Sequence, residues 1–394
     1  MSELDAFRHE VRLWLDAHCP APMRELTRGE EDIVWGGRRW AFRSEAERVW
    51  LERMAERGFT VPTWPKAYGG AGLSRDEERV LREEMARIGA RSPLESFGIW
   101  MLGPALLKFG NEAQKREHLP RIARGEIRWC QGYSEPNAGS DLASLQTRAE
   151  DRGDHWVVNG QKVWTSYADQ ADWIFCLVRT DPAAPKHRGI SFVLFDMATP
   201  GVSTRPIRLI SGKSPFCETF FDDVRVPKEN LVGELNRGWD IAKYLLTHER
   251  EMIGGGAGGL LGTRPIGEVV AELAGSDGEG ISDPLLRADV MRAEIDTLAF
   301  ALTMDRLRDE AAGGQGIGAR SAMLKYYGTE LNKRRTELML RAAGSDGLEW
   351  EGERSGGGRL ARDWLRAKGN SIEGGTSEVM LGIIAKAILE LPGA

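Results

Sequence analysis

Hydrophobic positions in the first third of the chain recur at helical spacing. Leu81, Met85 and Ile88 are separated by four and three residues, which places them on one face of a helix. The segment 45–58 (EAERVWLERMAERG) is also amphipathic and stops at a glycine, so it predicts a second helix. Between them, 61–72 (VPTWPKAYGGAG) has the proline and glycine content of a loop. We therefore predict that this part of the chain is a helical domain.

The pattern becomes that of strands after residue 127. Short apolar runs bounded by turn residues follow one another: DWIFCLVRT, GISFVLFD and ETFFDDVRVP. Before them, HWVVNGQKVW holds Asn159-Gly160 between β-branched residues, which predicts a hairpin turn at that pair. The sequence thus predicts a small antiparallel β domain, of a size usual for a domain.

Helical spacing returns from residue 229 onward. Apolar residues recur every three or four positions in one long segment: Leu285, Leu286, Val290, Met291, Ile295, Leu298, Leu302 and Leu307. The segment 377–392 (SEVMLGIIAKAILELP) predicts a further helix, stopped by its proline. The predicted domains are a helical domain over 1–127, a β domain over 128–228 and a helical domain over 229–394.

Composition narrows the class of protein. With 53 basic and 59 acidic residues among 394, the net charge is −6, so a basic nucleic-acid groove is not expected. No apolar run approaches the length of a membrane span, and the first residues have no apolar core of a signal peptide. The four cysteines form no CxxC pair, which argues against a disulfide framework or structural zinc. We expect a soluble, cytoplasmic protein.

Familiar catalytic motifs fail on spacing or context. The segment 254–259 fits GxGxxG but follows a helical pattern rather than a strand, so close helix packing is the better interpretation. His248-Glu249 begins like the zinc motif HExxH, but Met252 stands in place of the second histidine. No serine lies in a GxSxG elbow. The sequence therefore predicts neither a metal site nor a hydrolase.

Two polar segments remain as candidates for a binding site. Residues 130–145 (CQGYSEPNAGSDLASL) combine turn-forming residues with short polar side chains, and such a loop can hold a polar ring edge or a phosphate. Further on, Trp164 is followed by Thr165 and Ser166, an aromatic face beside two hydroxyls that suits a planar ligand. Taken alone, each segment fits an ordinary turn or a core tryptophan at least as well.

Together with three further segments, these two resemble the acyl-CoA dehydrogenase family, flavoproteins that introduce a Cα–Cβ double bond into acyl-CoA thioesters. The resemblance covers nearly the whole chain. Its segments are WPKAYGGAG (64–72), SEPNAGSD (134–141), NGQKVWTS (159–166), FFDDVRVPKENLVGELNRGW (220–239) and GGTSEVMLGIIAKAILELP (374–392). It implies a mostly helical α+β fold: an N-terminal helical domain, a middle antiparallel β domain and a C-terminal four-helix bundle.

The resemblance implies FAD as the cofactor. By their places in the family motifs, Ser134 lies at the flavin pyrimidine edge, Trp164 packs beside the isoalloxazine, and Ser166 reaches flavin N5. The expected FAD contacts are Gln131, Tyr133, Ser134, Gly139, Ser140, Trp164, Thr165, Ser166, Thr376 and Glu378.

The resemblance also implies a carboxylate base that removes the substrate's α-proton. Many members place a glutamate directly before the Gly-Thr of the C-terminal signature, where this chain has Gly374. Isovaleryl- and long-chain-type members place it on the first helix of the C-terminal domain, before an arginine, and Glu249-Arg250 matches that place. We predict Glu249 as the base, with Glu373 as the alternative. Arg250 and Ser140 are the predicted substrate contacts.

The resemblance leaves the wider function open between related alternatives. We expect an acyl-CoA substrate from fatty acid or steroid side-chain catabolism, and an electron-transfer flavoprotein or similar acceptor. An acyl-CoA oxidase of the same fold and a non-catalytic partner subunit are the alternatives. The family's Arg-x-x-Phe-Gly segment is reduced here to Arg264 and Gly267, as in relatives that act on bulky thioesters. We expect a homo-oligomer (dimer or tetramer) or a heteromer with a related chain.

Overall fold

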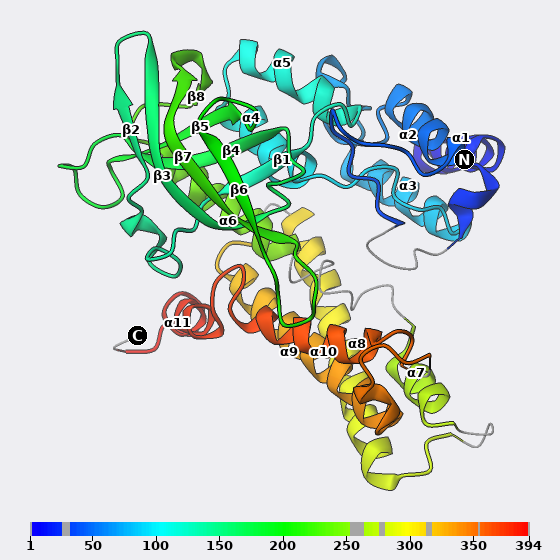
Figure 1. The fold of residues 1–394 in the computed structure, drawn as a ribbon. Helices are drawn as coiled ribbons and strands as arrows, with labels where there is room; N and C mark the ends of the chain where they lie inside the picture. The colour runs from blue at the N-terminus through cyan, green and yellow to red at the C-terminus, as the bar shows by residue number, and fades with distance from the viewer. Residues whose placement is uncertain are drawn as a thin grey trace. The chain divides into compact units, whose positions relative to one another are not determined.

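The computed structural model of the chain describes residues 2–25, 32–252, 264–275, 280–312, 317–353 and 355–392. The chain forms two compact units. The first comprises Met1–Pro206 and Phe216–Leu245, and the second comprises Ile207–Pro215 and Leu246–Ala394. The first unit holds helices and a β-sheet, and the described residues of the second form helices joined by loops, together with the short 207–215 segment (Figure 1).

Helices come first in the first unit: α1 (Glu3–His18), α2 (Glu45–Glu56), α3 (Arg75–Arg87), α4 (Gly103–Phe109) and α5 (Glu112–Ala123). The predicted helices around 45–58 and 81–88 are confirmed by α2 and α3. Ser74 caps α3 with a capping box that satisfies backbone N–H groups at both Ser74 and Glu77. The apolar faces of α1, α2 and α3 pack together in one core that includes Leu15, Trp50 and Leu81.

One sheet forms the rest of the first unit: β1 (Trp129–Gly132), β2 (Arg148–Asp151), β3 (His155–Ser166), β4 (Trp173–Arg179), β5 (Ile190–Asp196), β6 (Val202–Ile207), β7 (Phe216–Pro227) and β8 (Leu231–Val232). Its strand order is β6-β7-β3-β2-β4-β5-β8, with β1 beside β4. Most pairings are antiparallel, as predicted, while β4 pairs in parallel with β1 and β2. The sheet buries an apolar core that includes Val158, Ile174 and Phe195.

The predicted hairpin turn at Asn159-Gly160 is wrong. Both residues lie inside β3, where the pairing with β7 shifts register. The turn that joins β2 to β3 contains Gly153 instead, with a φ of 86°. Gly160 has a φ of 149°, and a Cβ there would lie 2.6 Å from the hydroxyl oxygen of Thr147. Glycine is therefore needed here for a close approach across the sheet, not for a turn.

Helix α6 (Gly238–Met252) has residues in both units, and five α-helices follow it in the described part of the chain. They are α7 (Ile266–Leu273), α8 (Pro284–Ala312), α9 (Arg320–Ala343), α10 (Arg359–Lys368) and α11 (Ser377–Ala387). The predicted long helix is confirmed by α8, and the helix predicted over 377–392 by α11. Helix α9 contacts α7, α8, α10 and α11, and Figure 1 shows α8 and α9 as the long helices of this unit.

Helix α8 is apolar on two faces. One face is buried in the bundle and includes Val290, Phe300 and Leu307. The other face, here called the α8 stripe, is more than half exposed and consists of Met291, Ile295, Leu298 and Leu302. The stripe residues are spaced by four, three and four positions. This spacing is typical of the apolar face with which one helix packs against another. None of the helices in the described ranges is both long and apolar enough to cross a membrane.

Candidate functional site

The C-terminal end of strand β3 holds an exposed tryptophan with an unusual backbone conformation. Trp164 is 54% exposed and has a φ of 60°, a region that bulky residues rarely adopt. Such a conformation costs about 1–3 kcal/mol and persists where the surrounding structure fixes it, often at ligand sites. The ring of Phe216 meets the Trp164 ring edge-on, with centroids 6.0 Å apart. The first unit therefore presents a fixed aromatic surface to its surroundings.

The two residues after Trp164 differ in burial. Thr165 is fully buried opposite Cys217 of β7, and its hydroxyl oxygen has no hydrogen-bond partner among the described residues. Ser166 is partly exposed. The carbonyl of Ser134 accepts a hydrogen bond of 2.9 Å from the amide of Val163, which brings that partly exposed serine beside the same end of β3. Ser134 and Ser166 are thus two partly exposed serines close to Trp164, one through a backbone hydrogen bond and one through the chain.

The loop after β1 carries most of the other predicted contacts. Gln131 is partly buried in β1, and Tyr133 is buried, with its ring edge-on to Phe175. Gly139 and Ser140 are exposed, and no atom lies within 4 Å of the position of a Cβ at Gly139. The loop therefore has open space where the sequence predicts contact with a ligand.

These features fit a planar cofactor with a polar edge. An exposed aromatic ring, two partly exposed serines and an open glycine lie in one unit. The Val163–Ser134 backbone bond joins β3 to the loop, and the Ala138–Glu135 bond closes a turn within the loop. Aromatic surface combined with a few polar groups is the usual composition of a cofactor site. The residues of the first unit are therefore suited to hold the ring end of FAD.

A buried ion pair that the sequence did not single out lies beneath this loop. The ammonium of Lys162, which is 0% exposed, donates to Glu135 Oε1 at 2.8 Å and to the carbonyl of Tyr133 at 3.0 Å. Burial opposes ionisation of Glu135, but the Lys162 charge and hydrogen bonds outweigh it and lower the pKa of that carboxyl. The sequence did indicate that Lys162 is buried. It lies an even number of residues from the buried Trp156 and Val158, and alternate residues of a strand face the same side.

The C-terminal signature forms a helix start in the second unit. Thr376 is the N-cap of α11, and its hydroxyl accepts a hydrogen bond of 3.2 Å from the amide of Val379. Glu378 is exposed in the first turn, where a backbone hydrogen bond and the Thr376 hydroxyl lower the pKa of its carboxyl. Gly374 and Gly375 both have positive φ, which suits glycine at the place where many members have the base.

The two candidate bases, Glu249 and Glu373, lie in different parts of the chain. Glu249 and Arg250 fall within α6, but their side chains lie outside the described residues. The carboxylate of Glu373 accepts a hydrogen bond of 2.8 Å from Arg366 and another from the Asn370 amide. The alternative base is therefore already engaged in an ion pair within its own unit.

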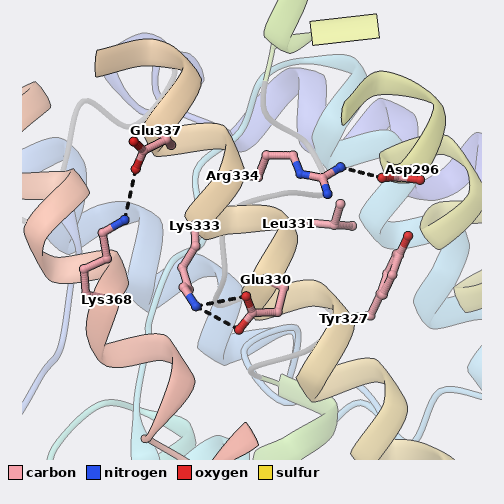
Figure 2. Close-up of a pocket in the computed structure, with 8 residues that line it drawn as sticks. All are labelled: Asp296, Tyr327, Glu330, Leu331, Lys333, Arg334, Glu337 and Lys368. Carbon is pink, nitrogen blue, oxygen red and sulfur yellow. Dashed lines mark hydrogen bonds and ion pairs between the residues drawn. The ribbon is translucent and has the colours of Figure 1, made fainter. Parts of the chain in front are cut away.

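A charged hollow of about 290 Å³ lies on the helices of the second unit. Figure 2 shows three ion pairs around it, Asp296 with Arg334, Glu330 with Lys333, and Glu337 with Lys368. Tyr327 also lines the hollow, and burial followed by the charge of Asp296 raises the pKa of its hydroxyl. Among the residues whose side chains the structure describes, none of those predicted for cofactor binding lines this hollow.

Three family domains match successive parts of the chain. The N-terminal domain of acyl-CoA dehydrogenases matches residues 1–126, the middle domain matches 130–224, and the C-terminal domain matches 236–389. The predicted fold class, a helical domain, a β domain and a helical bundle, is thereby confirmed.

Full-length relatives support the same assignment. The chain is 37% identical to acyl-CoA dehydrogenase IpdE1 of Mycobacterium tuberculosis over 398 residues, which cover 100% of this chain and 99% of the relative. The structure titled Tcur3481-Tcur3483 steroid ACAD matches with a TM-score of 0.79 and 32% identity, over 99% of this chain and 98% of the other. The ChsE4-ChsE5 complex from Mycobacterium tuberculosis matches with a TM-score of 0.75 and 30% identity, over 100% and 99% of the two chains.

Proposed function

Because this chain belongs to the acyl-CoA dehydrogenase family, and is therefore an oxidoreductase, we propose that it binds FAD beside Trp164 and uses Glu249 as its base. The observation that carries the proposal is the exposed Trp164 ring on its strained backbone, with the partly exposed Ser166 two positions on and Ser134 bound through its carbonyl to Val163. Bound FAD supplies the acceptor for the hydride that leaves Cβ of the acyl group.

The residues of the chain then have separate tasks. Glu249 takes the proton from Cα, and the electron pair of that C–H bond becomes the new double bond as hydride leaves Cβ. The carboxylate becomes a neutral acid and later returns its proton to water, so a dry pocket that raises its pKa favours the reaction. Ser134 and Ser166 hold the polar edge of the cofactor. Ser140 and Arg250 contact the substrate.

The Glu373 environment supports Glu249 as the base. The carboxylate of Glu373 is already held by Arg366 at 2.8 Å and by the side-chain amide of Asn370, so it serves as a structural contact within its own unit. Its neighbour Gly374 carries no side chain, so the usual signature position cannot act.

Substitution of the two glutamates tests the assignment. Glu249→Gln should keep its bound FAD but lose substrate-dependent bleaching of the flavin by about 100-fold or more, the usual contribution of a general base. Glu373→Gln is the matched control and should bleach at close to the normal rate. Normal bleaching by Glu249→Gln, with loss in Glu373→Gln, would reverse the assignment.

A panel of acyl-CoA thioesters identifies the substrate. One matching structure is titled a steroid ACAD, so we propose a bulky, ring-bearing acyl group ahead of a straight fatty acyl chain. Anaerobic titration of both classes, followed by flavin absorbance, distinguishes them.

We propose an electron-transfer flavoprotein as acceptor. Peroxide release under air would instead indicate an oxidase, and a protein that stays colourless with added FAD would indicate a non-catalytic subunit.

The α8 stripe supports assembly with another chain. Four large apolar side chains exposed along one helix face are more than a monomer normally leaves in water. Two of the matching structures have titles that name two components. We therefore propose that this face packs in a homo-oligomer or in a heteromer with a related chain. Light scattering of the purified protein distinguishes the two, and Leu298→Asp should release monomers in the first case.

A further inference from the structure

We propose that Lys162 is a positioning residue for the cofactor, since its buried ammonium sets the place of Ser134 relative to the Trp164 segment. This inference rests on the proposed function, because it concerns how the same site is held in shape. Lys162 does not itself reach the accessible surface, as its side chain is 0% exposed. It acts through the backbone and side chains that it binds.

The contacts of Lys162 surround Ser134 on both sides. The ammonium donates to the carbonyl of Tyr133 at 3.0 Å and to the carboxylate of Glu135 at 2.8 Å, the residues directly before and after Ser134. The next residue of β3, Val163, donates its amide to the carbonyl of Ser134 at 2.9 Å. Three consecutive residues of the loop are thus bound by two consecutive residues of the strand, directly before Trp164.

The carboxylate of Glu135 extends this hold to the far end of the loop. Its two oxygens accept hydrogen bonds from the amides of Gln146 at 2.6 Å and Thr147 at 2.9 Å. Thr147 in turn lies against Gly160 of β3, where only glycine leaves enough room. The loop that holds Gly139 and Ser140 is therefore closed at its base by one carboxylate and one ammonium.

The chemistry of the pair favours a role in geometry over a role in stability. Two apolar side chains of similar volume could fill the same buried space with little or no loss of stability. They could not direct a carbonyl and two amides to fixed places, since hydrogen bonds are directional and apolar contacts are not. An error of about 1 Å in a catalytic site is enough to reduce a rate by about 100-fold.

Removal of the ammonium tests the inference. Lys162→Met should weaken FAD binding by the apoprotein by about tenfold or more, measured as quenching of FAD fluorescence. It should also shift the flavin absorption maxima and the reduction potential. Glu84→Gln is the matched control, because Glu84 is an equally buried carboxylate among the N-terminal helices, bound to arginines of α1 and α3. It should change stability and leave FAD affinity, spectrum and potential as they are.

A second variant keeps the test decisive if Lys162→Met fails to fold. Lys162→Met/Glu135→Gln leaves no unpaired charge and keeps one oxygen, for the amide of Thr147, so it should fold and still bind FAD weakly. Unchanged affinity, spectrum and potential in a folded variant would overturn the inference while the proposed function stands. A wild-type protein that binds no FAD would overturn the proposed function, and the inference with it.

Discussion

Two buried carboxylates in the first unit are neutralised in different ways. Glu84 of α3 has a side chain that is 2% exposed and is bound by arginines whose own side chains are 36–46% exposed: Arg8 at 3.2 Å, Arg12 at 2.9 Å and Arg87 at 2.7 Å. Within the described residues, Glu135 is bound by one cation, Lys162, whose side chain is 0% exposed. The first cluster therefore keeps its cations in contact with water, and the second removes its cation from water altogether.

The difference teaches what each cluster does. The Glu84 cluster joins α1 to α3, and any of its arginines can return to water when the carboxylate is lost. The Glu135 cluster joins the loop after β1 to β3, and its ammonium is buried and cannot be solvated in the same way. A buried charge left without a partner costs far more than an exposed one. The same substitution at the two glutamates should consequently give unequal results.

Glu135→Gln should have the largest effect on stability. It removes the countercharge of a fully buried ammonium, so we expect a loss of about 3 kcal/mol in the free energy of unfolding, as for other broken buried pairs. Urea unfolding of the apoprotein, followed by tryptophan fluorescence, measures the loss. Glu52→Leu, on the exposed face of α2, is the control and should change stability by less than about 0.5 kcal/mol. A loss below about 1 kcal/mol for Glu135→Gln would show that Lys162 finds another partner.

Glu84→Gln should destabilise the first unit by about 1–2 kcal/mol, the usual worth of hydrogen bonds to charged groups. The loss is smaller because the arginines remain solvated and the amide still accepts hydrogen bonds. The same urea experiment measures it beside Glu135→Gln. Equal losses in the two variants would contradict the distinction between the clusters.

Local pattern predicted the elements that carry both clusters. The spacing of Leu81, Met85 and Ile88 located α3, and the apolar runs located the strands, because each kind of element buries its apolar residues at a characteristic spacing. The family motifs predict Trp164 as a flavin contact, and this stays a prediction. Its positive φ and its exposure depend on the register shift of β3 against β7, which no short segment encodes.

The misses have the same physical origin. Asn159-Gly160 has the local signature of a turn, but the approach of Thr147, which is distant in sequence, requires the glycine instead. Lys162 and Glu135 are 27 positions apart, so their pairing appears only when β3 lies beside the loop. An inward-facing lysine in a strand can be noticed in the sequence, whereas its partner cannot be identified there.

Acid should weaken the Glu84 cluster in a defined range of pH. The hydrogen bond from Arg12 and those from Arg87 and Arg8 hold the pKa of Glu84 at about 2, below its ordinary value of 4.5. A carboxyl with a lowered pKa stabilises the fold above the pKa of the unfolded chain and loses that contribution as the pH falls toward the folded value. The stability difference between wild type and Glu84→Gln should be constant from pH 7 to about pH 5.5 and should shrink by about 1 kcal/mol by pH 4. A difference that grows on acidification would contradict the assignment.

Removal of both partners of the second cluster should have the smallest effect on stability. In Lys162→Met/Glu135→Gln no charge is buried, and the glutamine oxygen still accepts from the amide of Thr147. We expect the double variant to lie within about 1 kcal/mol of wild type, above Glu135→Gln, because apolar replacement of a buried pair is often neutral. Urea unfolding of wild type, both single variants and the double variant gives the coupling energy directly.

Replacement of Arg12 in the Glu84→Gln variant should not restore stability in this way, because the Arg12 side chain is partly exposed and stays solvated without its partner. If the double variant instead lost as much stability as the two single variants combined, the Lys162 pair would be needed for folding as such, and the contrast between a cluster that joins helices and one that shapes a site would disappear.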